Sequence, residues 1–166
     1  MTKLKYELIN RPDRKMILKW SKDAKNYIDY VEEIGCGEND DSSAWDILTE
    51  IKDAILEPVG AWFSDSMVSE NKGSYAHGVE VPSTYRYSVP EGFEMIDLPS
   101  CEYIIFIGEP YNEKDEQFVI KDTVKQIDDF DIEVISYKYA YESGPKMQLK
   151  PQGKRGYVEL RPVVAI

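Results

Sequence analysis

Residues 93–111 limit the fold of this chain more than any other stretch. They contain two strand-like runs, 93–98 (FEMIDL) and 102–107 (EYIIFI), separated by a Pro-Ser-Cys sequence. The second run is rich in β-branched and aromatic residues, with Pro99 before it and Gly108 after it. This pattern is typical of a centrally placed, buried strand. We therefore expect residues 102–107 to lie in the middle of a β-sheet.

The N-terminal part of the chain predicts an interrupted strand followed by a helix. Residues 3–20 read as a strand that is bulged or broken at Pro12, because proline cannot donate a ladder hydrogen bond. Apolar residues recur at intervals of three and four within residues 22–34, which predicts an amphipathic helix. The Gly-Cys-Gly sequence at 35–37 is expected to end it.

A second helix is predicted for residues 44–55, whose apolar positions share one face. Ser43 and Asp46 have the spacing of a capping box, with Asp in place of the usual Glu. Pro58 would stop the helix.

The rest of the chain adds further strand and helix patterns. In order they are a loop, a strand, a helix, a tyrosine-rich segment and two short strands, at residues 61–72, 74–81, 113–128, 132–141, 147–149 and 157–164. The whole chain reads strand, helices, strand, strand, and then strand, helix, strand, strand. A length of 166 residues fits one domain. We expect a single α+β domain, residues 1–166, with half-modules at roughly 1–98 and 99–166.

The charge balance argues against nucleic acid as a partner. The sequence has 20 Lys and Arg residues against 31 Asp and Glu residues, a formal net charge of −11. Binding to a phosphate backbone needs clustered cations instead. The acidic surplus favours a cationic small molecule or a basic protein surface, although most of these charges are expected to serve solubility.

The sequence offers little for a metal site and indicates a cytoplasmic protein. Cys36 and Cys101 are the only cysteines and are expected to be free thiols. His77 is the only histidine, so we expect neither a metal site nor another cofactor. No apolar run has the length needed to cross a bilayer, and the first ten residues do not read as a signal peptide. The oligomeric state is left open.

Five short motifs give the chain a family resemblance. They are WDILTEIKDAILEPVG, GVEVP, EGF, EPY and RGYVELRP, at residues 45–60, 78–82, 91–93, 109–111 and 155–162. In order and spacing they resemble the GyrI-like family, which is also the effector-binding domain attached to AraC-type and MerR-type transcription regulators. The motifs run through almost the whole length of the chain.

The resemblance implies an α+β fold made of two strand-helix-hairpin modules related by a pseudo-twofold axis, with an antiparallel sheet and a central ligand cleft. It also implies that bulky planar or cationic hydrophobic compounds bind in this cleft, which is lined by aromatic rings and a carboxylate. Some stand-alone members of the family are implicated in opening the cyclopropane ring of DNA-alkylating compounds by hydrolysis. This chain shows no helix-turn-helix segment, so we expect a stand-alone module that does not bind DNA directly.

Glu159 is the leading candidate for the site. In the sequence YVELR, alternation puts Tyr157, Glu159 and Arg161 on one face of a strand and the two apolar residues on the other. A carboxylate facing the cleft would neutralise a cationic ligand or polarise a water molecule. In a hydrolase, Glu159 would be the base, with Tyr157 or Tyr137 as hydrogen-bond donor to the developing oxyanion. The alternative is a structural ion pair of Glu159 with Arg161 or Arg155.

The remaining candidates are ligand-binding residues from the loop and from other predicted strands: Trp62, His77, Glu80, Tyr103 and Tyr139. Aromatic rings stack on planar molecules and attract cations through the ring quadrupole. Trp62 would act as a lid, and His77 would titrate near neutral pH. Each has a structural alternative, which is core packing for the rings, a hydrogen-bonded position for His77 and a solvated strand edge for Glu80.

Three functions remain open at this point. The first is a module that binds hydrophobic small molecules, and it needs only a cleft, aromatic walls and a carboxylate. The second is a hydrolase acting on cyclopropanoid compounds in the same cleft. The third, the weakest, is an acidic protein that binds a basic surface on an enzyme such as a topoisomerase.

Overall fold

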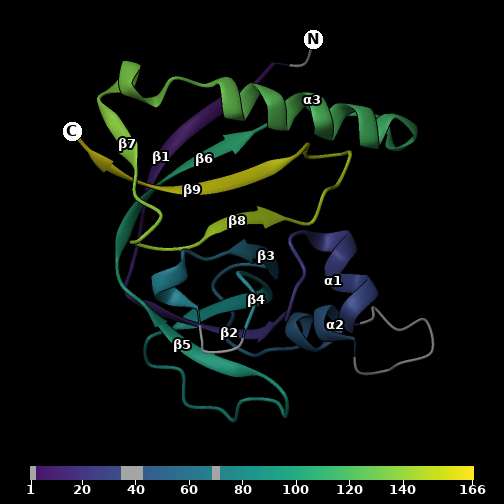
Figure 1. Cartoon of the computed structure of the whole chain (residues 1–166), viewed down its shortest axis with the longest axis vertical. Coiled ribbons are helices and arrows are strands. Elements are labelled where there is room, and N and C mark those ends of the chain that lie inside the picture. The colour runs from purple at the N-terminus through teal and green to yellow at the C-terminus, as the bar shows by residue number, and fades with distance from the viewer. Residues whose placement is uncertain (1–2, 35–42, 69–71) are drawn as a thin grey trace.

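The computed structural model describes residues 3–34, 43–68 and 72–166, and the strands in these ranges form one antiparallel sheet (Figure 1). The strands are β1 (Lys5–Arg11), β2 (Arg14–Trp20), β3 (Val59–Trp62), β4 (Tyr75–Pro82), β5 (Glu94–Leu98), β6 (Cys101–Ile107), β7 (Tyr137–Tyr139), β8 (Lys146–Leu149) and β9 (Val158–Ala165). Their order is β1-β6-β9-β8-β3-β4-β2-β5, and β7 pairs with β9. The helices are α1 (Tyr27–Ile34), α2 (Ala44–Thr49) and α3 (Glu116–Asp129), with 3₁₀ turns at Asp65–Met67, Glu113–Asp115 and Ile132–Ile135. The α+β fold class is confirmed.

A long two-stranded ribbon joins the two ends of the sheet. β1 pairs with β6 and β2 pairs with β5, so one chain segment runs from β1 into β2 while its partner runs from β5 into β6. Arg11 lies opposite Cys101 before the bend, and Arg14 lies opposite Leu98 after it. Pro12 lies in the bend, where its missing N–H interrupts the ladder. The predicted break at this proline is confirmed.

The strand predicted to be central is interior but not in the middle. β6 has β1 on one side and β9 on the other, and its Ile104 and Phe106 are fully buried. β1 is the last strand of the order, whereas β8 and β3 occupy the middle. The prediction was wrong in position because an apolar run indicates that both faces of a strand are covered, and says nothing about how many strands lie beyond its neighbours.

The helices cover the sheet in two separate places (Figure 1). α1 and α2 pack beside β2 and β4, where Tyr30 and Leu48 are fully buried. α3 packs along β6 and β9, where Ile127 meets Phe106 in a second cluster. The other face of the sheet, on which Leu160 lies, carries a third cluster of buried apolar residues. This cluster contains residues from both halves of the sheet. β3 and β8 therefore lie between two helical groups that approach the same face.

The helix predicted for residues 44–55 is shorter than expected. α2 ends at Thr49, and the side chain of Ser43 makes no capping hydrogen bond, so both the predicted length and the capping box are corrected. Asp53 adopts a left-handed conformation with φ of 61°. The Ile55 amide then donates to the Glu80 carbonyl oxygen at 2.9 Å, which ties this segment to β4 instead of to another helical turn.

The segment predicted as a loop, residues 61–72, begins inside the sheet. β3 ends at Trp62 and lies between β4 and β8. It was missed because it has four residues, contains Gly60 and follows Pro58, which gives no readable alternation.

The other predicted elements correspond more closely to the structure. The strand at 74–81 is β4, the helix at 113–128 is α3, and the two C-terminal strands are β8 and β9. The helix predicted for 22–34 begins only at Tyr27, as α1, so its predicted start is corrected. The predicted helix end at 35–37 and the thiol of Cys36 lie outside the described residues. No helix in the described ranges is long and apolar enough to span a membrane. The internal repeat stays a prediction.

Candidate functional site

A cavity of about 360 Å³ lies between the two helical groups, over the middle of the sheet. Its floor is formed by β3 and β8, and its walls come from α1, α2, β4 and the first turns of α3. The residues that line it are Tyr27, Ile28, Trp45, Gly60, Tyr75, Glu116, Gln117, Ile120, Gln148, Leu149, Lys150 and Pro151. We call this cavity the interhelical cleft. Its size and largely apolar lining are those of a small-molecule site.

The floor of the cleft depends on a glycine. Gly60 lies opposite His77 on one side and opposite Gln148 on the other. The Tyr75 hydroxyl lies directly over Gly60, so that a Cβ atom at this position would overlap it. Because Tyr75 is fully buried, the ring has little room to move aside. The absence of a side chain at Gly60 therefore lets a tyrosine hydroxyl reach the cleft floor.

Aromatic rings enclose His77 behind one wall of the cleft. The imidazole stacks on Tyr30 with 3.8 Å between ring centroids, and it also contacts the rings of Tyr27 at 5.4 Å and Trp45 at 5.0 Å. Its Nε2 atom is 2.9 Å from the Tyr75 hydroxyl. Burial lowers the pKa of His77 to about 3, so the ring is neutral at pH 7. His77 therefore holds the wall residues in place and is not itself among the residues that line the cleft.

Glu159 lies one strand beyond the cleft floor. It is opposite Gln148 across the β8–β9 pair, it is 2% exposed, and both of its oxygens accept hydrogen bonds from residues two positions away along the chain. The Tyr157 hydroxyl donates to Oε1 at 2.7 Å, and Nε of Arg161 donates to Oε2 at 2.6 Å. Burial and the adjacent carboxylate raise the pKa of the Tyr157 hydroxyl, so it remains protonated. Tyr157, Glu159 and Arg161 therefore lie together, as predicted. Glu159 forms the structural ion pair with Arg161 that was the alternative to a carboxylate facing a ligand.

Arg161 extends this constellation toward α3. Its Nη2 atom donates to Asp128 at 2.7 Å, while its Cζ lies 5.4 Å from the centroid of the Tyr139 ring. Burial opposes the charge of the guanidinium, but the carboxylates of Glu159 and Asp128, with a smaller contribution from Tyr141, together outweigh burial and raise the pKa of Arg161. Tyr139 stacks on Tyr141 at 5.5 Å, and its buried hydroxyl has no hydrogen-bond partner among the described residues.

Two predicted residues lie near this face but outside the cleft lining. Trp62 packs on Tyr75 with 4.9 Å between ring centroids, and its indole N–H donates to the Lys25 carbonyl oxygen at 2.7 Å. Trp62 is therefore held in β3 beside the cleft and is not a lid in a loop. Tyr137 lies opposite Ala165, about 20 Å along β9 from Glu159. The structure does not bring Tyr137 to the carboxylate that it was predicted to assist.

Glu80 and Tyr103 lie on the opposite face of the sheet. Glu80 is fully buried and forms ion pairs with Arg11 and with Nε of Arg14, the latter at 2.7 Å. The Tyr103 hydroxyl donates to the Pro145 carbonyl oxygen at 2.8 Å, and the Tyr103 ring lies 5.6 Å from the guanidinium of Arg14. These residues form a buried polar cluster at the bend of the ribbon and do not reach the cleft.

Sequence reasoning missed the residues that form the aromatic walls. Tyr27 was read as one of the apolar positions of α1, Trp45 appeared only within a family motif, and Tyr75 was one tyrosine among twelve. Gly60 was the sequence signal that could have indicated the cleft floor, because a glycine within a strand indicates close approach by another group.

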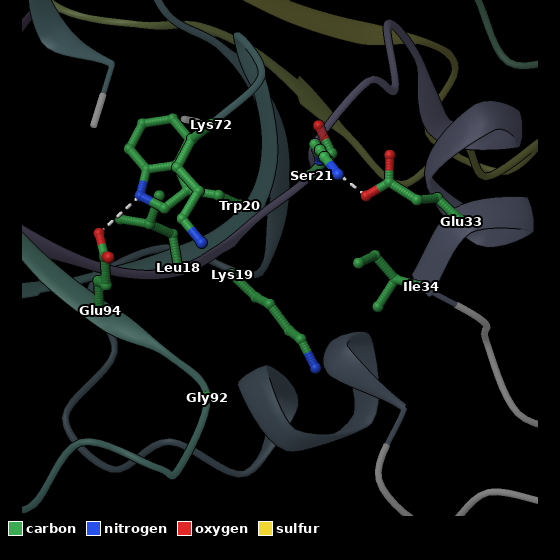
Figure 2. Close-up of a pocket in the computed structure, with 10 residues that line it drawn as sticks. Leu18, Lys19, Trp20, Ser21, Glu33, Ile34, Lys72, Gly92 and Glu94 are labelled. Carbon is green, nitrogen blue, oxygen red and sulfur yellow. Dashed lines mark hydrogen bonds between the residues drawn. The ribbon is translucent and has the colours of Figure 1, made fainter. Parts of the chain in front are cut away.

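A second cavity, of about 440 Å³, lies at the end of β2 beside α1 (Figure 2). Its charged lining consists of Lys19, Lys22, Lys72, Glu33 and Glu94. The Trp20 indole donates to Glu94 at 2.7 Å, and the Lys22 amide donates to Glu33 at 2.7 Å. With one aromatic ring in its lining, this cavity does not have the aromatic walls expected of the site. Among the described residues, no cluster of His, Cys, Asp or Glu is arranged for a metal ion.

No protein-family model matches the sequence, and no curated protein matches it either. Similar solved structures do exist. SAV2435 bound to tetraphenylphosphonium has a TM-score of 0.56 and 12% identity, with 96% of this chain and 94% of that chain covered. A putative bacterial transcription regulation protein from Staphylococcus aureus MU50 has a TM-score of 0.52 and 13% identity, with 96% and 97% covered. The chain therefore shares the α+β fold of these two proteins, in agreement with the fold class predicted from the sequence.

Proposed function

We propose that the chain is a GyrI-like module that binds a hydrophobic aromatic small molecule in the interhelical cleft. The observation that carries this proposal is the wall formed by Tyr27 and Trp45, whose rings meet edge to face at 6.3 Å above a floor made by Gly60 and Gln148. Such walls bind planar molecules by stacking. The carboxylate that lines the cleft is that of Glu116, whereas Glu159 is buried beyond the floor.

The fold relationship supports binding of a small molecule. SAV2435 was solved with tetraphenylphosphonium, a compound with four phenyl rings, and its fold covers nearly all of this chain. That ligand is also a cation. The aromatic part of such a ligand fits the walls seen here, and the charge is a separate property that depends on the residues around the floor.

Binding of the uncharged fluorescent probe N-phenyl-1-naphthylamine tests this proposal. Trp45→Ala or Tyr27→Ala is expected to weaken binding at least about tenfold, because each removes a stacking surface that the probe would cover. The probe's fluorescence enhancement gives the Kd. Phe118→Ala is the matched control, since Phe118 lies on α3 with 77% of its surface exposed and does not line the cleft. Equal losses in all three variants, or none in the two wall variants, would contradict the proposal.

The hydrolase function stays a prediction. Each oxygen of Glu159 accepts a short hydrogen bond from a buried protein donor, Tyr157 or Arg161. A carboxylate held in this way is a poor base for a water molecule. The structure thus gives the binding function more support than catalysis.

A further inference from the structure

The side chain of Gln148 bears on the class of ligand, an inference that rests on the proposed function. Gln148 lies in β8, on the floor of the interhelical cleft, and is half-buried. Its carboxamide makes no hydrogen bond with any residue in the described ranges. A primary carboxamide carries one carbonyl acceptor and two N–H donors in a single plane. The cleft floor therefore offers both kinds of hydrogen-bonding group to a molecule in the cleft.

The neighbours of Gln148 explain why its carboxamide is unpaired. Gly60, opposite it on β3, has no side chain. Glu159, opposite it on β9, accepts hydrogen bonds from other residues at both oxygens. Lys146 lies two residues away on the same face of β8, but its ammonium lies 4.5 Å from the centroid of the Trp62 ring. None of these three neighbours on the sheet therefore satisfies the amide.

The charged residues that line the cleft provide no net charge that would select an ion. They are Glu116 and Lys150, which carry opposite charges. The Glu116 carboxylate also accepts a hydrogen bond from the Tyr111 hydroxyl at 2.9 Å. Lys150 is exposed, and solvent weakens the attraction of an exposed charge. Selectivity in this cleft is therefore expected to come from neutral hydrogen bonds.

An aromatic ligand in the cleft would change the surroundings of Gln148. A molecule that stacks on Tyr27 and Trp45 would exclude water from the floor. A polar group that loses water without gaining a partner costs free energy, and one that gains a partner does not. An aromatic hydrocarbon would leave the Gln148 amide without a partner. A site with such a group favours ligands that hydrogen-bond to it over analogues that do not.

We propose that the cleft selects a neutral, planar aromatic lactam. Its ring N–H would donate to the side-chain carbonyl oxygen of Gln148, and its carbonyl oxygen would accept from the side-chain NH₂ group. A lactam places this donor and this acceptor side by side in the plane of its rings, as the edge of adenine does when a glutamine binds it through two hydrogen bonds. The rings would stack on Tyr27 and Trp45. Gln148 is thus the residue that determines which aromatic compounds bind tightly.

The test compares phenanthridinone, a planar lactam of three fused rings, with its N-methyl derivative, which has the same rings and charge but no N–H. Each is titrated as a competitor against bound N-phenyl-1-naphthylamine. Phenanthridinone is expected to displace this probe at a concentration about tenfold lower than the N-methyl derivative, because methylation removes the donor and leaves the Gln148 carbonyl unpaired. Equal potency, stronger displacement by the N-methyl compound, or displacement by neither would overturn the inference.

Gln148→Met is expected to reduce this ratio to about one, because methionine is a flexible side chain of similar length without an amide. The two potencies are compared within each variant, so a general change in the cleft affects both compounds alike. Gln152→Met is the matched control and should keep the ratio, since Gln152 is exposed and does not line the cleft. A ratio that survives in Gln148→Met would contradict the role of Gln148. Failure of N-phenyl-1-naphthylamine to bind wild-type protein would instead overturn the proposed function.

Discussion

Replacing Glu80 with Gln is expected to lower the free energy of unfolding by about 3–5 kcal/mol. The Glu80 carboxylate is fully buried and is shared by Arg11 and Arg14, whose side chains come from either side of the ribbon bend. Without it, the guanidinium of Arg14 would stay buried with carbonyl oxygens such as that of Pro99, 2.9 Å away, as its remaining acceptors. Leaving a buried charge uncompensated costs far more than the pair itself contributes.

Urea unfolding followed by circular dichroism measures this loss. Asp97→Asn is the matched control, because Asp97 pairs with Lys15 at 2.7 Å in an exposed position. A surface pair of this kind contributes at most about 1 kcal/mol. Similar losses in the two variants would show that the cluster at the bend does not hold the two halves of the sheet together.

Acidification from pH 7 to pH 5 is expected to lower the free energy of unfolding by about 2 kcal/mol through His77 alone. In the folded chain, burial lowers the pKa of His77 to about 3, whereas in the unfolded chain the imidazole titrates near its ordinary value of 6.5. The unfolded state therefore binds more protons between these two values. Stability contributed by the neutral ring is present above pH 6.5 and is lost as the pH falls toward 3.

Because His77 is the only histidine in the sequence, this pH window isolates its contribution. Unfolding by urea at half-unit steps between pH 5 and pH 7 gives the slope. His77→Gln keeps a hydrogen-bonding group near the Tyr75 hydroxyl and removes the titration, so its stability should be nearly flat over this range. An equal slope in both proteins would rule out His77 as its cause.

Local sequence patterns predicted most of the elements but not their arrangement. Alternation in residues 157–161 correctly placed Tyr157, Glu159 and Arg161 on one face, because the period of a strand fixes the side of each residue. The position of β6 in the sheet depends on long-range pairing with β1 and β9, for which a single sequence carries no local signal. The early end of α2 likewise depends on a hydrogen bond to β4.

The sequence predicted the candidate site only in part, because contacts between residues far apart in the chain leave no local signal. Glu159 was predicted to face the cleft, with an ion pair to Arg161 or Arg155 as the alternative, because the sequence pattern alone cannot distinguish a carboxylate that contacts a ligand from one that is hydrogen-bonded by its chain neighbours. Glu80 and Tyr103 were placed among the ligand contacts although their strands turn them to the other face of the sheet. The cleft walls come from α1, α2, β4 and α3, which meet only through tertiary packing.

The indole N–H signals of the protein's three tryptophans test binding in the cleft most directly. Trp45 lines the cleft, Trp62 lies beside it, and Trp20 lines the cavity of Figure 2. In a ¹H–¹⁵N NMR titration with N-phenyl-1-naphthylamine, the signal of Trp45 should shift most, that of Trp62 less, and that of Trp20 should remain in place. A shift of Trp20 with Trp45 unchanged would place the ligand in the other cavity and contradict the account.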